Sequence, residues 1–244
     1  MGKKRVTLDY DSWAEKAIIT TDRKGQEWNY TNFIKVINDT GLLKKIKSIA
    51  EVGGADGYNL SQIVKESCAI EVTNYELAKP HVEKGRAEHP EIKFVQGDFM
   101  KIDAEPVDLI MFSDVVEHVE DDEKFMEKCA RCGRYGLFKI PVEDAYYIKL
   151  QIVAGRRVPP GPNHPSGHIR DYTYGGAIAL VGKYFEVLAV EYPDYTEVTP
   201  KNTFFGKMHA FMFGASRRIS SGLCSALFGG PIFVLCKSRL YNEG

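Results

Sequence analysis

The sequence predicts an α/β fold built on a mostly parallel sheet, and two observations carry this prediction. Between about residue 47 and residue 140, apolar stretches of strand length alternate with segments whose apolar residues recur at helical spacing. Such alternation is typical of βαβ units and a parallel sheet. Several of the apolar stretches are nearly continuous, which indicates strands that are buried on both faces.

Seven strands and four helices between them are expected along the chain. The first strand is IKSIAEVG, and the fourth, VDLIMFSD, is almost entirely apolar. The predicted strands are 46–53, 69–76, 92–98, 107–114, 136–142, 185–192 and 231–240. The predicted helices run through Leu60 to Val64 and over 81–88, 121–132 and 172–184.

Residues 1–45 precede the first strand and carry apolar residues at helical spacing, among them Trp13 and Ala17. This spacing predicts a helical N-terminal cap on the sheet. Residues 46–244 are then expected to form the main domain.

Two segments interrupt the second half of that domain. Prolines and glycines punctuate residues 143–171, so we expect mostly loop or a lid there. Residues 193–230 form an insertion rich in Phe, Met and Gly, with Arg217 and Arg218 in its middle. Two interpretations stay open: the insertion packs against the sheet edge, or it receives an apolar acceptor or contacts lipid.

Composition narrows the class of protein. The chain has 244 residues, of which 44% are hydrophobic and 27% charged, as expected of a globular protein. Its 32 basic and 33 acidic residues give a net charge of −1, so no overall field attracts nucleic acid. Five scattered cysteines indicate reduced thiols. With no secretory segment and no apolar run of membrane-spanning length, we expect a cytoplasmic protein.

The stretch EVGGADGY joins the first strand to the following helix. Gly53, Gly54 and Gly57 let the backbone turn tightly there and let a ligand approach where a Cβ would clash. A nucleotide-type ligand fits such a turn. The dinucleotide pattern G-x-G-x-x-G fails, because Ala55 and Tyr58 stand at two of its positions.

EVGGADG, from Glu51 to Gly57, resembles the acidic-x-Gly-x-Gly-x-Gly first motif of class I S-adenosylmethionine-dependent methyltransferases, with Ala55 replacing the middle glycine. The resemblance extends to about Val142. It implies a Rossmann-like, doubly wound, seven-stranded sheet whose last strand is antiparallel. It also implies S-adenosyl-L-methionine as cofactor, held by the glycines, with Glu51 near the amino group of the methionine moiety.

A second acid is expected at the end of the next strand, where a carboxylate accepts hydrogen bonds from ribose hydroxyls. Glu76 is favoured, because the family's strand-then-helix pattern places it at the strand end. Glu71 and the neutral Asn74 remain alternatives. The segment FVQGDFM resembles the family's adenine-binding segment, which implies that Asp98 faces the adenine amino group and that Phe99 lies beside the ring.

Residues 107–125 resemble the fourth motif of the small-molecule subgroup, which includes quinone-biosynthesis methyltransferases with a similar Glu-His pair. The resemblance places Ser113 and Asp114 where the strand meets the methyl group. His118 is the candidate general base, since imidazole takes a proton from a hydroxyl near neutral pH. The alternative is that His118 belongs to the polar entrance of a helix.

Four residues of the lid segment are candidates for substrate binding: His164, His168, Arg170 and Tyr172. We expect no metal site, because Pro165 and Gly167 disfavour a helix that would align the two histidines. The single Cys129-x-x-Cys132 pair supplies only two of four zinc ligands, so we expect both thiols to face the core.

The sequence therefore predicts a methyltransferase that acts on oxygen or carbon of a small molecule, without nucleic acid as partner. A non-catalytic S-adenosylmethionine-binding module and an RNA or protein methyltransferase are the alternatives. Neither the acceptor nor the oligomeric state follows from the sequence.

Overall fold

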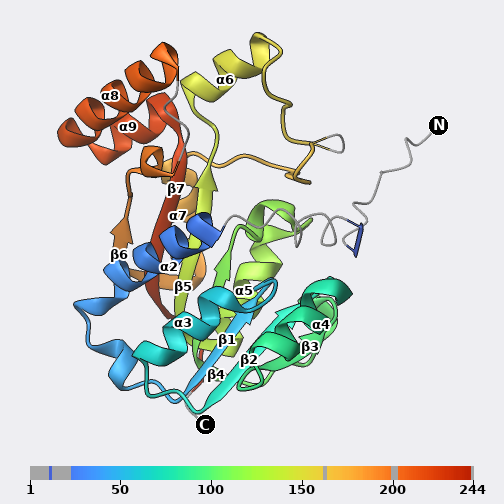
Figure 1. The fold of residues 1–244 in the computed structure, drawn as a ribbon. Coiled ribbons are helices and arrows are strands. Elements are labelled where there is room, and N and C mark those ends of the chain that lie inside the picture. The colour runs from blue at the N-terminus through green and yellow to red at the C-terminus, as the bar shows by residue number, and fades with distance from the viewer. Residues whose placement is uncertain (1–10, 13–22, 162–163, 199–202, 243–244) are drawn as a thin grey trace.

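A seven-stranded sheet with helices on both faces forms the protein (Figure 1). The computed structural model describes residues 11–12, 23–161, 164–198 and 203–242. The strand order is β3-β2-β1-β4-β5-β7-β6. The strands are β1 (Ser48–Val52), β2 (Glu71–Glu76), β3 (Lys93–Gln96), β4 (Val107–Ser113), β5 (Gly133–Val142), β6 (Phe185–Glu191) and β7 (Gly230–Ser238).

The first five strands pair in parallel, whereas β7 is antiparallel to both β5 and β6. This arrangement confirms the predicted mostly parallel sheet with an antiparallel last strand. Each observed strand overlaps its predicted range, because continuous apolar stretches mark strands that are covered on both faces. The helices are α2 (Arg23–Asn38), α3 (Tyr58–Glu66), α4 (Lys79–Glu88), α5 (Asp122–Cys132), α6 (Tyr146–Val153), α7 (Tyr174–Tyr184), α8 (Phe204–Ile219) and α9 (Ser221–Phe228).

Two apolar clusters sandwich the sheet. One contains buried residues of α2, α3 and α4 with one face of the strands, and the other contains buried residues of α5, α7 and α9 with the opposite face. The thiols of Cys129 and Cys132 are buried in the second cluster, as expected of core residues.

Helix α2 covers the antiparallel side of the sheet. The Phe33 ring lies edge-on to Phe233 of β7 with 5.0 Å between centroids, and Trp28 contacts the same ring at 5.7 Å. A helix therefore lies within the expected cap, whereas Trp13 and Ala17 fall outside the described residues.

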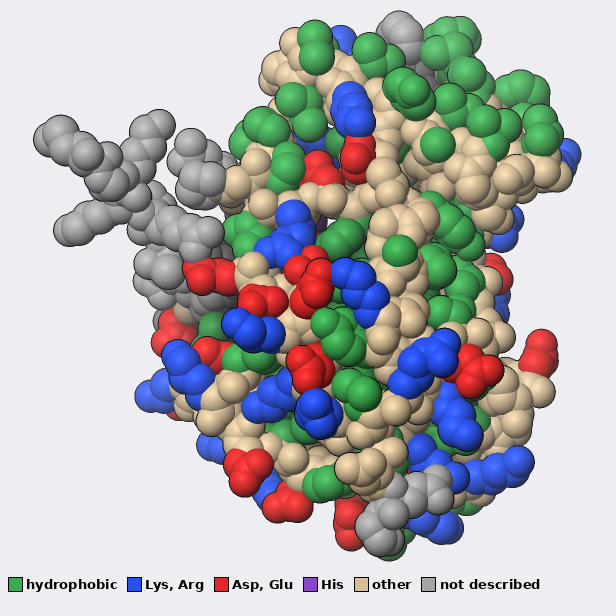
Figure 2. Space-filling model, turned by 180° about the vertical axis from the view of Figure 1, so that it is seen from behind, with side chains coloured by type: hydrophobic (Ala, Val, Ile, Leu, Met, Phe, Trp, Pro, Cys, Tyr) green, Lys and Arg blue, Asp and Glu red, His purple; other side chains and the backbone are tan. Residues whose placement is uncertain are grey.

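The expected lid and insertion both contain helices. Residues 143–171 include α6, and residues 193–230 include α8 and α9, which gather at one end of the molecule (Figure 1). Apolar side chains cluster at this end (Figure 2), and several on α8 are exposed: Phe204, Met208, Phe211, Met212 and Ile219. Among the described helices, none combines the length and apolar character needed to cross a membrane.

The packing of α2 predicts the effect of truncating its central ring. Phe33→Ala should lower the free energy of unfolding by about 3–5 kcal/mol, because Phe33 is fully buried and its removal leaves a cavity. Ile70→Ala is the control and should change it by less than about 0.5 kcal/mol, since Ile70 is 82% exposed. Urea unfolding measures both, and equal effects would contradict this packing of α2.

Candidate functional site

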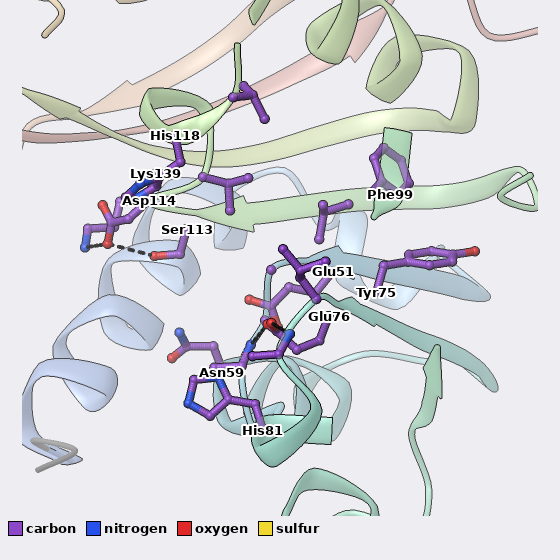
Figure 3. Close-up of a pocket in the computed structure, with 18 of the residues that line it drawn as sticks. Glu51, Asn59, Tyr75, Glu76, His81, Phe99, Ser113, Asp114, His118 and Lys139 are labelled. Atoms are coloured by element: carbon purple, nitrogen blue, oxygen red, sulfur yellow. Dashed lines mark hydrogen bonds and ion pairs between the residues drawn. The ribbon is translucent and has the colours of Figure 1, made fainter. Parts of the chain in front are cut away.

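A cavity of about 660 Å³ opens at the carboxyl ends of the parallel strands. It lies where the strand order reverses, because β1 pairs with β2 on one side and with β4 on the other. Open α/β sheets bind ligands at such a switch point. Most of the predicted cofactor residues line this cavity: Glu51, Gly53, Gly54, Glu76, Asp98, Phe99 and Ser113. Figure 3 labels four of them, Glu51, Glu76, Phe99 and Ser113.

The glycine stretch forms a bend after β1 that excludes side chains. Gly53 has a φ of 68° and Ala55 a φ of 48°, both in the left-handed region that favours glycine. A Cβ on Gly54 would lie 2.5 Å from Oε2 of Glu51. Gly57 lies outside the cavity lining and instead begins α3, where an added Cβ would meet Phe94 at 2.8 Å.

Asn74 and Glu76 of β2 hold this bend in place. Asn74 accepts a hydrogen bond from the Gly54 amide at 3.2 Å and donates one to the Ala55 carbonyl at 3.1 Å. Glu76 accepts from the amides of Ala55, at 2.9 Å, and Ala78, at 2.8 Å. A carboxylate has about four acceptor positions, so Glu76 keeps two for a ligand.

The three candidates for the second acid lie in different places. Glu76 ends β2 and lines the cavity, whereas Asn74 is fully buried behind the bend. Glu71 begins the same strand, so it is exposed at the end of β2 that lies away from the cavity. Only Glu76 is therefore placed to contact a ligand in the cavity.

Glu51 is a buried carboxylate without a hydrogen-bond partner for Oε2. Burial, followed by the charges of the nearby Glu76 and Asp56 carboxylates, raises its pKa from 4.5 to about 8. An unpaired buried charge is costly. A cationic group in the cavity would therefore be stabilised at Oε2.

Asp98 and Phe99 line the cavity beyond β3. Asp98 caps the short helix η2 (Phe99–Lys101) by accepting a hydrogen bond from the Met100 amide at 3.0 Å. The buried Phe99 ring packs against Tyr75 with 5.4 Å between centroids. Acids from three neighbouring strands thus converge on one cavity, as predicted from their positions at strand ends.

A second polar group lies across the cavity, at the end of β4 (Figure 3). Ser113 ends the strand, and Asp114 follows with a φ of 55°. Asp114 forms an ion pair with Lys139 of β5. Lys139 was not predicted from the sequence, although a lysine inside the apolar strand GLFKIPV is a signal for a buried polar contact.

His118 ends the short helix η3 (Val116–His118) and lines the cavity. Burial lowers its pKa, and the neighbouring His168 lowers it further, so the imidazole is neutral near pH 7. Its Nε2 lies 3.7 Å from Oε1 of the fully buried Glu117. Burial, followed by the charge of Asp114, raises the pKa of Glu117 well above its usual value.

The lid candidates divide into two groups. His168 lines the cavity, and the buried His164 stacks on its ring with 4.6 Å between centroids. Arg170 and Tyr172 do not line the cavity. They bind the Asp122 carboxylate at the start of α5, at 2.5 Å and 2.8 Å, so they fasten this segment to the helix.

A second cavity of about 560 Å³ adjoins the first and lies beneath α6 and α8. Both cavities are lined by Lys139, Glu143 and Pro231, so they share a wall. The aromatic lining of this second cavity was not predicted, because it comes from segments far apart in the chain: Trp28, Tyr147, Tyr195, His209 and Phe228.

Comparisons with known proteins agree with this geometry. Residues 50–136 match the family model described as a methyltransferase domain. A search of curated proteins gave no match. The N-methyltransferase NodS from Bradyrhizobium japonicum WM9, solved with S-adenosyl-L-homocysteine, is 10% identical with a TM-score of 0.61, and the alignment covers 95% of this chain and 99% of NodS.

Two further solved structures share the fold. One is a chain of the Haloferax volcanii complex between the Trm112 methyltransferase activator and a methyltransferase, with 14% identity, a TM-score of 0.60, and coverage of 96% of this chain and 99% of that chain. The other is the [4+2]-cyclase SpnF, with 13% identity, a TM-score of 0.54, and coverage of 82% and 79%. At such identities the likeness establishes the fold alone.

The raised pKa of Glu51 predicts a pH-dependent stability. The folded protein holds this proton up to about pH 8, whereas the unfolded chain releases it near pH 4.5. The stabilising contribution is therefore full below pH 4.5 and is lost as pH rises through about 8. Glu51→Gln mimics the protonated form, so it should match the wild type near pH 5 and be more stable by a few kcal/mol near pH 9.

Urea unfolding of both proteins at the two pH values measures this difference. Asp108→Asn is a control for general effects of carboxylate removal, because Asp108 caps the other end of the sheet by accepting from the Lys47 amide at 2.6 Å. A difference in the free energy of unfolding between Glu51→Gln and the wild type that stays constant with pH would contradict the raised pKa of Glu51.

Proposed function

We propose that this chain, whose residues 50–136 match a methyltransferase-domain family model, is a class I methyltransferase that uses S-adenosyl-L-methionine as cofactor and transfers its methyl group to a small-molecule acceptor. One observation carries the proposal: acids from three neighbouring strands and a glycine-rich bend surround a single cavity, which adjoins a second cavity with an aromatic lining. The first cavity suits the cofactor, and the second suits the acceptor.

The residues of the first cavity fit the cofactor in chemistry as well as position. The unpartnered Oε2 of Glu51 would receive the cationic amino group of the methionine moiety. The bend at Gly53 and Gly54 would lie against its backbone. Glu76 would use its two remaining acceptor positions for the ribose hydroxyls.

The adenine would lie between Asp98, which is 41% exposed at its side chain, and the Phe99 ring. The Asp98 carboxylate would accept from the exocyclic amino group, and the ring would cover one face of the base. This assignment follows the resemblance of FVQGDFM to the adenine-binding segment of the family.

The cofactor supplies a methyl group on a positively charged sulfur, so the protein mainly has to align the acceptor. Alignment alone can lower the barrier by about 7–11 kcal/mol. Ser113 and Asp114 lie at the end of β4, where they line the first cavity, and would flank the transferring methyl. The neutral His118 would take the proton of a hydroxyl acceptor.

The second cavity favours an acceptor with an apolar or aromatic body. Tyr147, Tyr195 and Phe228 supply its walls, and exposed apolar side chains of α8 lie outside it. Such a space supports O- or C-methylation of a small molecule, in line with the resemblance to quinone-biosynthesis enzymes. We place the reaction in the cytosol, where the five free cysteines would stay reduced.

A combined binding and activity experiment tests this function. Isothermal titration should show one S-adenosyl-L-methionine per chain, and a labelled-methyl assay should show transfer to a phenol, quinone precursor, sugar or fatty acid. Binding without transfer to any small molecule would favour a non-catalytic module or other chemistry, as in the cyclase of the same fold. Transfer to RNA or protein, and to no small molecule, would instead favour an RNA or protein methyltransferase.

The position of Glu76 predicts its effect on cofactor binding. Glu76→Gln should weaken S-adenosyl-L-methionine at least tenfold, because each charge-assisted hydrogen bond to a ribose hydroxyl contributes roughly 1.5–3 kcal/mol. Glu71→Gln is the matched control on the same strand and should leave the affinity unchanged. Isothermal titration measures both.

A melting curve without ligand separates cofactor contact from support of the bend. Since Glu76 also accepts from the amides of Ala55 and Ala78, Glu76→Gln should lower the melting temperature somewhat. Unchanged cofactor affinity in a folded Glu76→Gln protein would refute the assigned ribose contact.

A further inference from the structure

Three side chains that end in metal-ligating atoms meet beside the candidate methyl-transfer position. Glu117 and His118 come from η3, and His168 comes from the segment after α6. Oε1 of Glu117 lies 3.7 Å from Nε2 of His118 and 3.9 Å from Nε2 of His168, and one ligand atom from each residue lies within 4.8 Å of the others. The Ile169 amide donates to the Glu117 carbonyl at 3.0 Å and holds the two segments together.

The Glu117 carboxylate is buried without a hydrogen bond to either oxygen. Among the described basic side chains, only the imidazoles of His118 and His168 lie within ion-pair distance of it. Nearby cations are engaged elsewhere: Lys139 pairs with Asp114, and Arg157 pairs with Glu143. A buried carboxylate of this kind requires a positive charge to offset its desolvation.

His168 is oriented to present a lone pair to this carboxylate. Its Nδ1 lies 2.8 Å from Oε2 of Glu143, and Arg157 braces the other oxygen of Glu143. When Nδ1 carries the proton and donates to Glu143, Nε2 is left as an acceptor that faces Glu117. A carboxylate behind a histidine in this way is the outer arrangement that orients metal-ligating histidines.

We propose that Glu117 Oε1, His118 Nε2 and His168 Nε2 bind a divalent transition-metal ion. Two imidazoles and one carboxylate suit Zn²⁺ or Fe²⁺, whereas Mg²⁺ prefers oxygen ligands. Tetrahedral ligands 2.0–2.1 Å from zinc lie about 3.4 Å apart, so the observed 3.7 Å and 3.9 Å require only a small contraction.

The ion would face the cavity with open coordination positions. His118 and His168 line the cavity, whereas Glu117 lies behind them, so the three ligands occupy one side of the site. This inference rests on the proposed function: the open positions would bind an acceptor hydroxyl. The acceptor class is thereby narrowed to molecules whose methylated oxygen can bind a metal.

The reaction at such a site balances without a redox step. The bound ion lowers the pKa of the acceptor hydroxyl, which releases its proton to solvent. The resulting oxygen anion forms a bond to the methyl carbon as the carbon–sulfur bond breaks, and that electron pair stays on sulfur. The metal remains divalent throughout. With the ion bound, its effect on the acceptor hydroxyl replaces the general-base role that the metal-free site gives to His118, which serves instead as a ligand.

Metal titration of the whole, chelator-treated protein tests the proposal. Zn²⁺ should bind at one ion per chain by isothermal titration, and Co²⁺ should acquire visible d–d absorption on binding to the same site. Glu117→Gln and His168→Ala should abolish both signals. Glu143→Gln should weaken Zn²⁺ binding by about 10–100-fold, because Glu143 orients a ligand without being one.

His89→Ala is the matched control. Nδ1 of His89 lies 3.5 Å from Oε1 of Glu91, so this histidine and acid pair equally closely outside the cavity. The variant should bind Zn²⁺ as the wild type does. Melting curves check folding, and Glu117→Gln should keep or raise the stability of the metal-free protein, because the amide has the same shape and cannot acquire a buried charge.

The outcomes separate this proposal from the proposed function. No Zn²⁺ or Co²⁺ binding by a wild-type protein that binds S-adenosyl-L-methionine would overturn the metal site alone. Equal Zn²⁺ affinity in wild type and in folded Glu117→Gln or Glu143→Gln would overturn it as well. Metal binding without any cofactor binding would leave the site standing and refute the proposed methyltransferase function.

Discussion

The bend between β1 and α3 is the constraint on which the rest of the site depends. The backbone turns there with left-handed residues at Gly53 and Ala55, and Gly54 lies so close to Glu51 that a side chain would displace its carboxylate. Asn74 and Glu76 bind the amides and a carbonyl of this bend. These contacts hold the carboxyl groups of Glu51, on β1, and Glu76, on β2, in position before any ligand binds.

The site contains two buried carboxyl groups with oxygens that the protein leaves without a hydrogen-bond partner. Glu51 and Glu117 are both buried, both have raised pKa values, and both have oxygens without hydrogen-bond partners. Such groups cost stability, and proteins keep this kind of cost at functional sites. The two carboxyl groups belong to different elements, Glu51 to β1 and Glu117 to η3 after β4, and each would stabilise a separate cation.

Local patterns predicted the sheet and most residues of the first cavity, because strand periodicity and acids at strand ends depend on short stretches of sequence. The metal-ligand cluster was not predicted, since only a helical pairing of His164 and His168 was considered. The fold instead brings His168 to Glu117, 51 residues away by number, through the Ile169 backbone contact. Arg170 looked available for substrate but is engaged by Asp122, a contact that no local pattern reveals.

Residues at the carboxyl end of β5 lie in the wall between the first cavity, where methyl transfer is proposed, and the second cavity, where the acceptor is proposed to bind. Lys139 neutralises Asp114 on one side and lines the second cavity on the other, and Glu143 both orients His168 and lines that cavity. A displacement of the residues that line the second cavity would therefore move the Glu143 carboxylate and, with it, the imidazole of His168. Because α6 follows Glu143 directly and forms part of the second cavity, a displacement of α6 by an acceptor would move the residue that orients His168. Acceptor fit and metal geometry are coupled by this connection, so an acceptor of the wrong shape would lose reactivity as well as affinity.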